Sequence, residues 1–234
     1  NVSKDGDKSI VKVTYRFPQV DAQWEITYKV FANGIIKVDN RFVAEGTETP
    51  MIPRVGLRMQ LSEILNDLTY YGRGPEENYR DRRTSQFIGE YTTPIKDLYE
   101  PYIRPQENEH RTDIYWCALT TKQKAGLLFI ADRTFELNAS NYLLGSLDSG
   151  ETIDNGTPRT NETNHRHLTD PQPVKQVDMF IDYRMMGVGG DNSWGAIAHE
   201  PYLIRPGVEN AIEYGFSIVP FDKKADYKNL IYQY

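Results

Sequence analysis

The sequence predicts an all-β fold in which two antiparallel sheets pack face to face. Short segments with strand-like alternation occur along most of the chain, and clusters of glycine, proline, asparagine and aspartate separate them. Tyrosine (16 residues) and phenylalanine (9 residues), which favour strands, are frequent. A chain of 234 residues is within the usual size of one such sandwich, so we expect a single domain over residues 1–234.

Charge and hydropathy exclude two classes of partner. The 33 acidic residues outnumber the 27 basic ones, for a formal net charge of −6, and no basic cluster alternates with aromatic residues, so we expect no nucleic acid partner. No apolar segment approaches the roughly 20 residues that cross a bilayer. The polar residues 1–9 lack the apolar centre of a signal peptide, and we expect no membrane partner. The chain begins without Met, which favours a piece of a longer protein.

The single cysteine, Cys117, excludes an internal disulfide. It lies in residues 113–119, a segment with the composition of a buried strand. We therefore expect a packed thiol rather than a nucleophile.

The N-terminal part contains the clearest strand pattern. Residues 11–17 alternate apolar and polar side chains with the period of two that marks a strand with one wet face. Residues 24–30 and 36–40 repeat the pattern on both sides of Asn33-Gly34, a type I′ turn signal, and predict a hairpin. Further strands are expected at residues 55–61, 68–71, 112–120, 127–131, 136–140, 177–184, 202–204 and 211–219. A short helix at residues 141–148 and a polar tail without a fold signal at residues 222–234 complete the assignment.

Residues 72–82 combine turn formers with charge. The glycines lack the spacing of a dinucleotide-binding fingerprint, and no strand–helix unit surrounds them, which argues against a phosphate site. Arginine–carboxylate pairs within the segment are expected to hold an irregular loop in one shape. The candidate partners are Glu76, Glu77, Arg80, Asp81 and Arg82.

Two further segments are expected to be extended or looped. Residues 91–111 contain three prolines and cannot belong to a continuous helix. Residues 150–173 are the most loop-like part of the chain and include His165-Arg166-His167. In an extended segment both imidazoles would point the same way, as two metal ligands do, but no third ligand is near in sequence, which favours structural histidines.

The most distinctive stretch is the glycine-rich segment 185–195. Four of its residues are glycines, which permit backbone conformations that side chains forbid, so we expect a shaped loop. Asp191 and Asn192 can bond back to neighbouring backbone amides, leaving Trp194 near the tip beside Ser193 and without local apolar cover. One interpretation is that the indole folds back to cover the end of a sheet. The other is a flat platform for a ligand such as the C–H face of a sugar.

No catalytic constellation follows from the residues alone, because the chain has no Gly-x-Ser-x-Gly elbow. Glycoside hydrolysis by two carboxylates needs a defined separation, roughly 5–5.5 Å in a retaining enzyme, which sequence spacing does not give. Sugar epimerisation needs a positioned acid and base. The candidates for that role are His165, His167, His199 and Glu107, although a structural role is favoured for each.

Three separated motifs carry a resemblance to a known family. They are Tyr70-Tyr71-Gly72-Arg73-Gly74-Pro75-Glu76-Glu77-Asn78-Tyr79 with Asp81-Arg82, then Tyr99-x-Pro101-Tyr102 with Pro105-Gln106-Glu107-Asn108, then Met186-Gly187-Val188-Gly189-Gly190-Asp191-Asn192-Ser193-Trp194. Together and in this order they resemble the C-terminal β-sandwich of the large β-galactosidases of glycoside hydrolase family 2. The resemblance covers residues 54–214, is looser before them, and leaves residues 222–234 unassigned.

The resemblance implies a galactose mutarotase-like supersandwich, the final domain of a multidomain retaining enzyme that hydrolyses terminal β-D-galactosides such as lactose. It also implies that the two catalytic glutamates lie on a barrel domain outside this chain, so no catalytic residue is expected here. Trp194 matches the family's loop tryptophan, which stacks on the sugar. The substrate-binding residues are therefore expected to be Trp194, Asp191, Asn192 and Ser193.

The same resemblance implies partners and cofactors. We expect contacts with other domains of the same enzyme, a homo-oligomer of the full-length protein, and Mg²⁺ and Na⁺ in other domains, with no cofactor and no metal ligand in this chain. The expected compartment is the bacterial cytoplasm or periplasm, with the cytoplasm favoured. Two alternatives stay open: a self-sufficient sugar-binding or aldose-epimerising module, and a domain that only supports its neighbours.

Overall fold

In the computed structural model, the described residues are 1–44, 50–103, 105–147, 167–169, 171–192, 194–206 and 211–233. Within them the strands are β1 (Val2–Asp5), β2 (Lys8–Phe17), β3 (Ala22–Phe31), β4 (Ile36–Ala44), β5 (Arg54–Ser62), β6 (Asp67–Gly74), β7 (Phe87–Pro94), β8 (Arg111–Thr120), β9 (Gly126–Ser140), β10 (Gln176–Met185) and β11 (Ile212–Phe221). The helical segments are short: α1 (Leu144–Leu147), α2 (Tyr227–Leu230) and the 3-10 turns η1 (Pro18–Val20), η2 (Ile95–Asp97) and η4 (Glu200–Tyr202).

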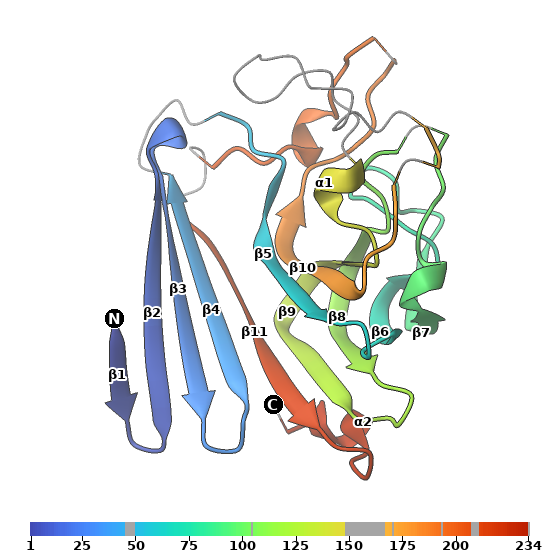
Figure 1. Cartoon of the computed structure of the whole chain (residues 1–234). Coiled ribbons are helices and arrows are strands. Elements are labelled where there is room, and N and C mark those ends of the chain that lie inside the picture. The colour runs from blue at the N-terminus through green and yellow to red at the C-terminus, as the bar shows by residue number, and fades with distance from the viewer. Residues whose placement is uncertain are drawn as a thin grey trace.

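All strand pairs are antiparallel, which confirms the all-β antiparallel prediction. The order is β1-β2-β3-β4-β11-β9-β8-β6-β7, and β5 joins through β10, which also pairs with β9. Figure 1 shows β1 to β4 and β11 on one side of the molecule and β5 to β10 on the other.

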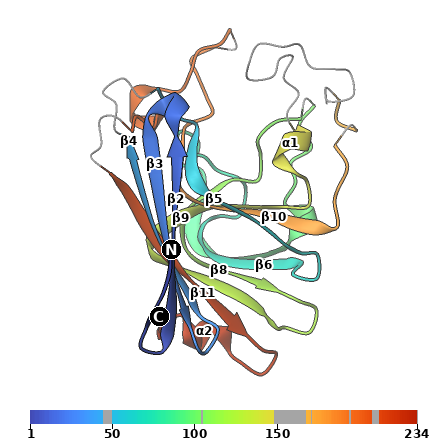
Figure 2. The same ribbon diagram turned by 60° about the vertical axis from the view of Figure 1, so that its left-hand side comes forward.

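The long strand β9 connects the two layers. Its first part, residues 126–131, pairs with β11, and its last part, residues 136–140, pairs with β10. β8 follows β9 along its other edge, with register shifts between Arg111 and Trp116. The strands expected at 127–131 and 136–140 are therefore one strand, and the two predicted sheets are one folded sheet, as the second view shows (Figure 2).

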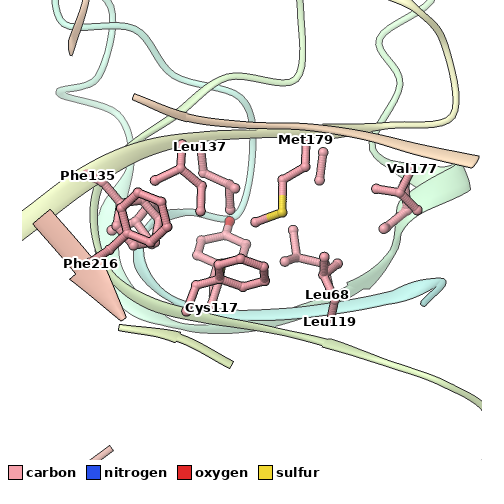
Figure 3. Close-up of a cluster of buried hydrophobic side chains, with 14 of the residues drawn as sticks. Leu68, Cys117, Leu119, Phe135, Leu137, Val177, Met179 and Phe216 are labelled. Atoms are coloured by element: carbon pink, nitrogen blue, oxygen red, sulfur yellow. The ribbon is translucent and has the colours of Figure 1, made fainter. Parts of the chain in front are cut away.

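The main core lies between two groups of strands: β5, β10 and the last part of β9 on one side, and β6, β8 and the first part of β9 on the other (Figure 3). Leu137 and Met179, from β9 and β10, point toward Leu68 and Leu119, from β6 and β8, and all four side chains are buried. The alternation that predicts the strands directs every second residue into this core, where removal of apolar surface from water stabilises the fold. Cys117 is fully buried beside them, and burial raises the pKa of its thiol, so it is the packed thiol that the sequence predicts.

The β3–β4 hairpin forms as predicted, but its turn is of a different type. The amide of Gly34 donates to the carbonyl oxygen of Phe31 at 3.0 Å, and the amide of Phe31 donates to the carbonyl oxygen of Ile35 at 2.9 Å. Gly34 has a φ of 85°, whereas Asn33 is not among the residues with positive φ. A type I′ turn needs two such residues, so the hairpin has instead the three-residue loop in which one left-handed glycine closes the turn.

Two further expectations are corrected by the structure. Residues 202–204 are not a strand, because the 3-10 turn η4 includes Pro201 and extends to Tyr202, with Leu203 as its C-cap. The helix expected over residues 141–148 is limited to the single turn α1 among the described residues.

The C-terminal tail is packed rather than without structure. Tyr227, at the start of α2, places its ring 5.1 Å from Phe221 and 6.1 Å from Trp116, measured between ring centroids. Asp226 caps the turn by accepting the amide hydrogen of Lys228. The tail thus covers a second apolar cluster on the outer face of β8, β9 and β11, a contact with no local sequence signal.

We predict that Tyr227→Ala lowers the free energy of unfolding by roughly 1–3 kcal/mol, because it removes a partly buried aromatic ring from this cluster. The matched control is Tyr232→Ala, since Tyr232 is 89% exposed on the same tail. The control should stay within about 0.5 kcal/mol of the wild type in urea denaturation. Equal effects of the two substitutions would contradict the packing of the tail.

Candidate functional site

A buried polar layer lies on the face of β9 and β10 that turns away from the main core. On β9, Glu136, Asn138 and Ser140 alternate with core residues and are buried. On β10, Asp178 and Asp182 are buried in the same way. Because buried polar groups need hydrogen-bond partners, this face must be satisfied by other segments of the chain.

Glu136 is the centre of this layer. Its Oε1 atom accepts a hydrogen bond from Arg80 Nε at 2.8 Å. Its Oε2 atom accepts from the backbone amide of Met185 at 2.6 Å and lies 3.0 Å from His110 Nε2. One buried carboxylate therefore joins β9 to three segments that are distant in sequence.

The imidazole of His110 is surrounded by hydrogen-bond acceptors. Its Nδ1 atom lies 2.7 Å from Asn138 Oδ1, and the amide nitrogen of Asn138 is already a donor to Asn108 and Glu107, so both ring nitrogens of His110 face acceptors. Burial alone would lower the pKa of His110, but the hydrogen bond to Glu136 and its charge outweigh burial and raise it. The Tyr79 ring stacks on the His110 imidazole with centroids 5.3 Å apart.

A second charged group lies beside the first. Arg54 Nη2 donates to Glu107 Oε1 at 3.0 Å and to Asn138 Oδ1 at 2.7 Å. Its Nε atom lies 2.9 Å from Asp182 Oδ2, an ion-pair distance without hydrogen-bond alignment. Burial raises the pKa of Asp182 to about 7, against the opposing charge of Arg54. The layer therefore contains several buried or partly buried charged groups of opposite sign that lie close to one another.

The tight turn of residues 79–82 lies over this layer. Tyr79 and Arg82 exchange two backbone hydrogen bonds of 3.1 and 2.8 Å. Arg82 also contacts Glu77 and the Tyr102 hydroxyl, whereas Arg80 reaches down to Glu136. The predicted arginine–carboxylate pairing is thus confirmed for Arg82 with Glu77, but Arg80 binds the sheet below and Asp81 binds a different loop.

That loop is the glycine-rich segment 185–195, and tertiary contacts hold its first five backbone amides. The amide of Met185 donates to Glu136, that of Met186 to the Pro53 carbonyl at 2.9 Å, and that of Gly187 to the Tyr202 carbonyl at 2.8 Å. The next two amides, of Val188 and Gly189, donate to Asp81 Oδ1 at 3.2 Å and Oδ2 at 2.7 Å. The backbone is thus tied to four separate parts of the chain.

Gly187 and Gly190 allow other atoms to lie where a Cβ atom would be, and unusual backbone angles are not the main reason for the loop glycines. A Cβ atom at Gly187 would lie 2.7 Å from the Asp81 carboxylate, and one at Gly190 would lie 2.1 Å from the Ala196 carbonyl oxygen. Gly195 is the loop glycine that has a positive φ, of 95°. The predicted shaped loop is present, although the expected reason for its glycines holds for Gly195 and not for Gly187 or Gly190.

The tip of the loop presents Trp194 to solvent, and its side chain is 93% exposed. Its backbone amide donates to Asn192 Oδ1 at 2.8 Å, as the sequence predicts for that residue. Asp191 instead accepts from His199 Nε2 at 2.8 Å. The indole does not cover the end of a sheet, so that interpretation of Trp194 is wrong.

A hollow of about 610 Å³ lies between the loop and the turn of residues 79–82. Its lining includes Tyr79, Arg82 and Tyr102 together with Val188 from the loop and Ile197, which follows the loop. Val188 and Ile197 are exposed, so the hollow includes apolar surface that is open to solvent, whereas Trp194 is not part of its lining. A rigid wall with apolar and hydrogen-bonding groups is the usual composition of a small-molecule site.

Comparison with known proteins shows the family to which the chain belongs. A family model described as the β-galactosidase small chain matches residues 1–218. The chain belongs to the β-galactosidase small-chain family. The match includes the first fifty residues and ends just before the packed tail.

Relatives from three bacteria are much longer than the segment that this chain matches in them. It is 31% identical to a β-galactosidase of Priestia megaterium over 85% of this chain and 19% of the relative. A β-galactosidase of Streptococcus thermophilus is 30% identical over 87% of this chain and 19% of its own length. One from Lactobacillus delbrueckii subsp. bulgaricus is 31% identical over 85% and 18%. The chain thus spans about a fifth of the length of the curated relatives it matches.

The four expected site residues are neighbours in sequence, and the structure describes three of them. Trp194, Asp191 and Asn192 lie together at the tip of the loop, and Ser193 lies outside the described residues. Glu107 accepts hydrogen bonds from Arg54 and Asn138, and His199 is hydrogen-bonded to Asp191. His165 lies outside the described residues, whereas His167 lies within them.

The sequence reasoning missed the residues beneath the loop, notably Asp182 and the network of His110, Glu136 and Asn138. Their one local signal is the alternation of polar and core residues in β9 and β10, which is also typical of a strand with a solvent-exposed face. Within the described part of the small chain, no group of three or more His, Cys, Asp or Glu side chains could hold a metal ion. The same residues contain no helix of the length and apolarity needed to cross a membrane.

Glu109 is a buried carboxyl at the edge of the layer. One oxygen accepts from Ser140 Oγ at 3.1 Å, whereas the other has no hydrogen-bond partner. Burial raises the pKa of Glu109 to about 8, with Ser140 and Arg111 acting in the opposite direction. The folded chain therefore holds this proton more tightly than the unfolded chain does.

We predict that Glu109→Gln flattens the pH dependence of stability between pH 7 and about 8. The wild type loses stability as the pH rises from the unfolded pKa of Glu109 to the folded one, with a slope of up to about 1.4 kcal/mol per pH unit from this group. Glutamine stays neutral and removes that slope. The range is chosen because the contribution of Asp182, whose pKa is raised to about 7, is largely complete below it.

Urea unfolding at a series of pH values from 5 to 9 measures this effect. The control is Glu63→Gln, which removes one negative charge from the exposed turn after β5 and should leave the slope in place. Equal slopes for wild type and Glu109→Gln between pH 7 and 8 would contradict the buried proton.

Proposed function

We propose that the chain is the terminal β-sandwich of a longer β-galactosidase and that it supplies Trp194 to a substrate site completed by another domain. The relatives that support this proposal are named β-galactosidases and are about five times as long as the aligned part. The structural observation that carries it is an indole that is 93% exposed on a loop whose backbone is tied to the fold.

The chemistry of the loop suits a sugar. An indole ring offers a flat apolar face to the C–H groups on one side of a pyranose, and its N–H can donate a hydrogen bond. A platform that is already rigid loses little conformational freedom when a ligand arrives, so more of the contact energy appears as affinity. Trp194, Asp191, Asn192 and Ser193 are the residues that we propose contact the β-galactoside.

The carboxylates near the loop support placing the catalytic pair on another domain. Both oxygens of Asp81 accept backbone amides, and Glu136 accepts three hydrogen bonds in the buried layer. Glu107 is paired with Arg54. A glycosidase needs one carboxylic acid free to donate a proton and one carboxylate free to attack or to activate water. We therefore assign the chain a binding role and the proton transfers to the rest of the enzyme.

The remaining parts of the proposal concern the full-length protein. We propose that it assembles as a homo-oligomer and that its Mg²⁺ and Na⁺ bind in other domains. We also propose a cytoplasmic location, which the single buried thiol, Cys117, is compatible with.

A second candidate function is a self-sufficient sugar-binding or aldose-epimerising module. The observation in its favour is the His199–Asp191 pair, an acid and a base 2.8 Å apart, of which Asp191 lies on the loop that carries Trp194. Calorimetric titration of the 234-residue chain with galactose and lactose separates the two candidates. The β-galactosidase proposal expects very weak binding or none, whereas saturable binding or epimerisation would favour the module.

We predict that Trp194→Ala in the full-length enzyme raises KM about fivefold to a hundredfold for a chromogenic β-galactoside, which corresponds to a stacking contribution of roughly 1–3 kcal/mol. The control is Tyr15→Ala on β2, which removes a half-exposed aromatic ring far from the loop in sequence and should leave KM unchanged. Steady-state kinetics and thermal melting of both variants make the comparison.

An unchanged KM and kcat in Trp194→Ala, with the fold intact, would remove Trp194 from the substrate site. That result would favour a domain that only supports its neighbours. Robust hydrolysis by the 234-residue chain alone would instead contradict the placement of the catalytic pair on another domain.

A further inference from the structure

Asp81 and the glycine-rich loop are held together over a long sequence distance. The Asp81 carboxylate accepts the amides of Val188 and Gly189, which are 107 and 108 residues further along the chain. Its two oxygens are divided between the two amides, one bond of 3.2 Å and one of 2.7 Å. A carboxylate that accepts two adjacent amides fixes the orientation of both peptide planes.

The fit is steric as well as polar. The space in which a Cβ atom of Gly187 would lie is filled by the Asp81 carboxylate carbon and oxygen, both 2.7 Å from that position. At Gly189 the corresponding distance to Asp81 Oδ2 is 3.2 Å. The two glycines therefore let the loop come down onto the carboxylate, and neither position accepts a larger residue without displacing Asp81.

The turn that carries Asp81 is itself tied to the buried polar layer. Tyr79 is buried and stacks on His110, and Arg82 lies over the Tyr79 ring at 5.1 Å from its centroid. Arg80 is bonded to the buried Glu136, the same carboxylate that accepts the amide of Met185 at the start of the loop. Asp81 thus belongs to a turn that is bonded to the sheet, and its carboxylate holds the backbone of the loop.

We propose that Asp81 is a positioning residue for Trp194, acting through the backbone of residues 187–190 and without contact to the sugar. This inference rests on the proposed role of Trp194 in the substrate site. Without the carboxylate, the amides of Val188 and Gly189 would be hydrated, and a segment with three glycines would sample many conformations. The indole at the tip would then have to be ordered at the moment of binding, which weakens affinity.

Asp81→Asn is the sharpest test because it keeps the volume and changes the chemistry. An asparagine has one acceptor oxygen and one NH₂ group. The NH₂ group would face the second loop amide, and both groups are hydrogen-bond donors. One of the two bonds is lost and a repulsive contact replaces it. Asp81→Ser, which is smaller and loses both bonds, serves as the second variant.

The first readout is kinetic and uses the full-length enzyme. Asp81→Asn is expected to raise KM roughly threefold to tenfold, because only part of the energy of one lost charge-assisted bond is transmitted to substrate affinity. It should leave kcat largely unchanged. In a Trp194→Ala background the same substitution should have no further effect on KM, since the group through which it acts is gone. A full effect in that background would overturn the proposal.

The second readout does not depend on activity. Hydrogen–deuterium exchange of the full-length enzyme, followed on peptides that cover residues 185–196, should show faster exchange in Asp81→Asn and faster still in Asp81→Ser. The control is Asp7→Asn, which removes an exposed aspartate from the turn between β1 and β2 and should leave this peptide unchanged. Unchanged exchange in both Asp81 variants would overturn the positioning role.

The two readouts separate the inference from the proposed function on which it rests. If Trp194→Ala leaves the kinetics unchanged, the proposed function fails, while the exchange measurement still decides whether Asp81 orders the loop. Melting temperatures of all variants should stay close to that of the wild type, because the Asp81 bonds lie at the surface of the fold.

Discussion

The structure depends on one requirement: the backbone amides of residues 185–189 need partners after β10 ends. A strand that leaves its sheet loses its ladder of hydrogen bonds, and an unpaired amide is costly where it is buried, as at Met185 and Gly187. Here Glu136, the Pro53 carbonyl, the Tyr202 carbonyl and the two oxygens of Asp81 supply the five acceptors. Residues 185–189 are therefore an irregular segment with the constraints of a strand, and Trp194 follows this segment on the same loop.

The fold was largely predictable because its information is local. Alternation with a period of two follows directly from the geometry of a strand, so most of the strand segments follow from their own residues. The exceptions depend on distant partners. The tail at α2 is ordered by Trp116 and Phe221, and its own sequence is polar. The type of the β3–β4 turn depends on how Gly34 closes the hairpin, which the Asn-Gly pair alone does not determine.

The candidate site was predictable at its tip and not at its base. Trp194 stands out in sequence because glycines and polar residues surround it, and the structure leaves it exposed. The network of His110, Glu136 and Asn138 has no such signal. Glu136 and Asn138 are 26 and 28 positions from His110 in sequence, and they contact it only after folding. Asp81 was expected to pair with a neighbouring arginine, but Arg80 and Arg82 have other carboxylates within reach, which leaves Asp81 for the loop.

The measurement that tests the central claim most directly is a pair of crystal structures of the full-length enzyme, without ligand and with a slowly hydrolysed β-galactoside. If the loop is a fixed platform, residues 185–195 should superpose within about 1 Å in the two structures, as in preorganised complexes. The Trp194 ring should then lie in van der Waals contact, about 4 Å, with the sugar. A loop that changes conformation on binding, or a sugar that does not touch Trp194, would contradict the account.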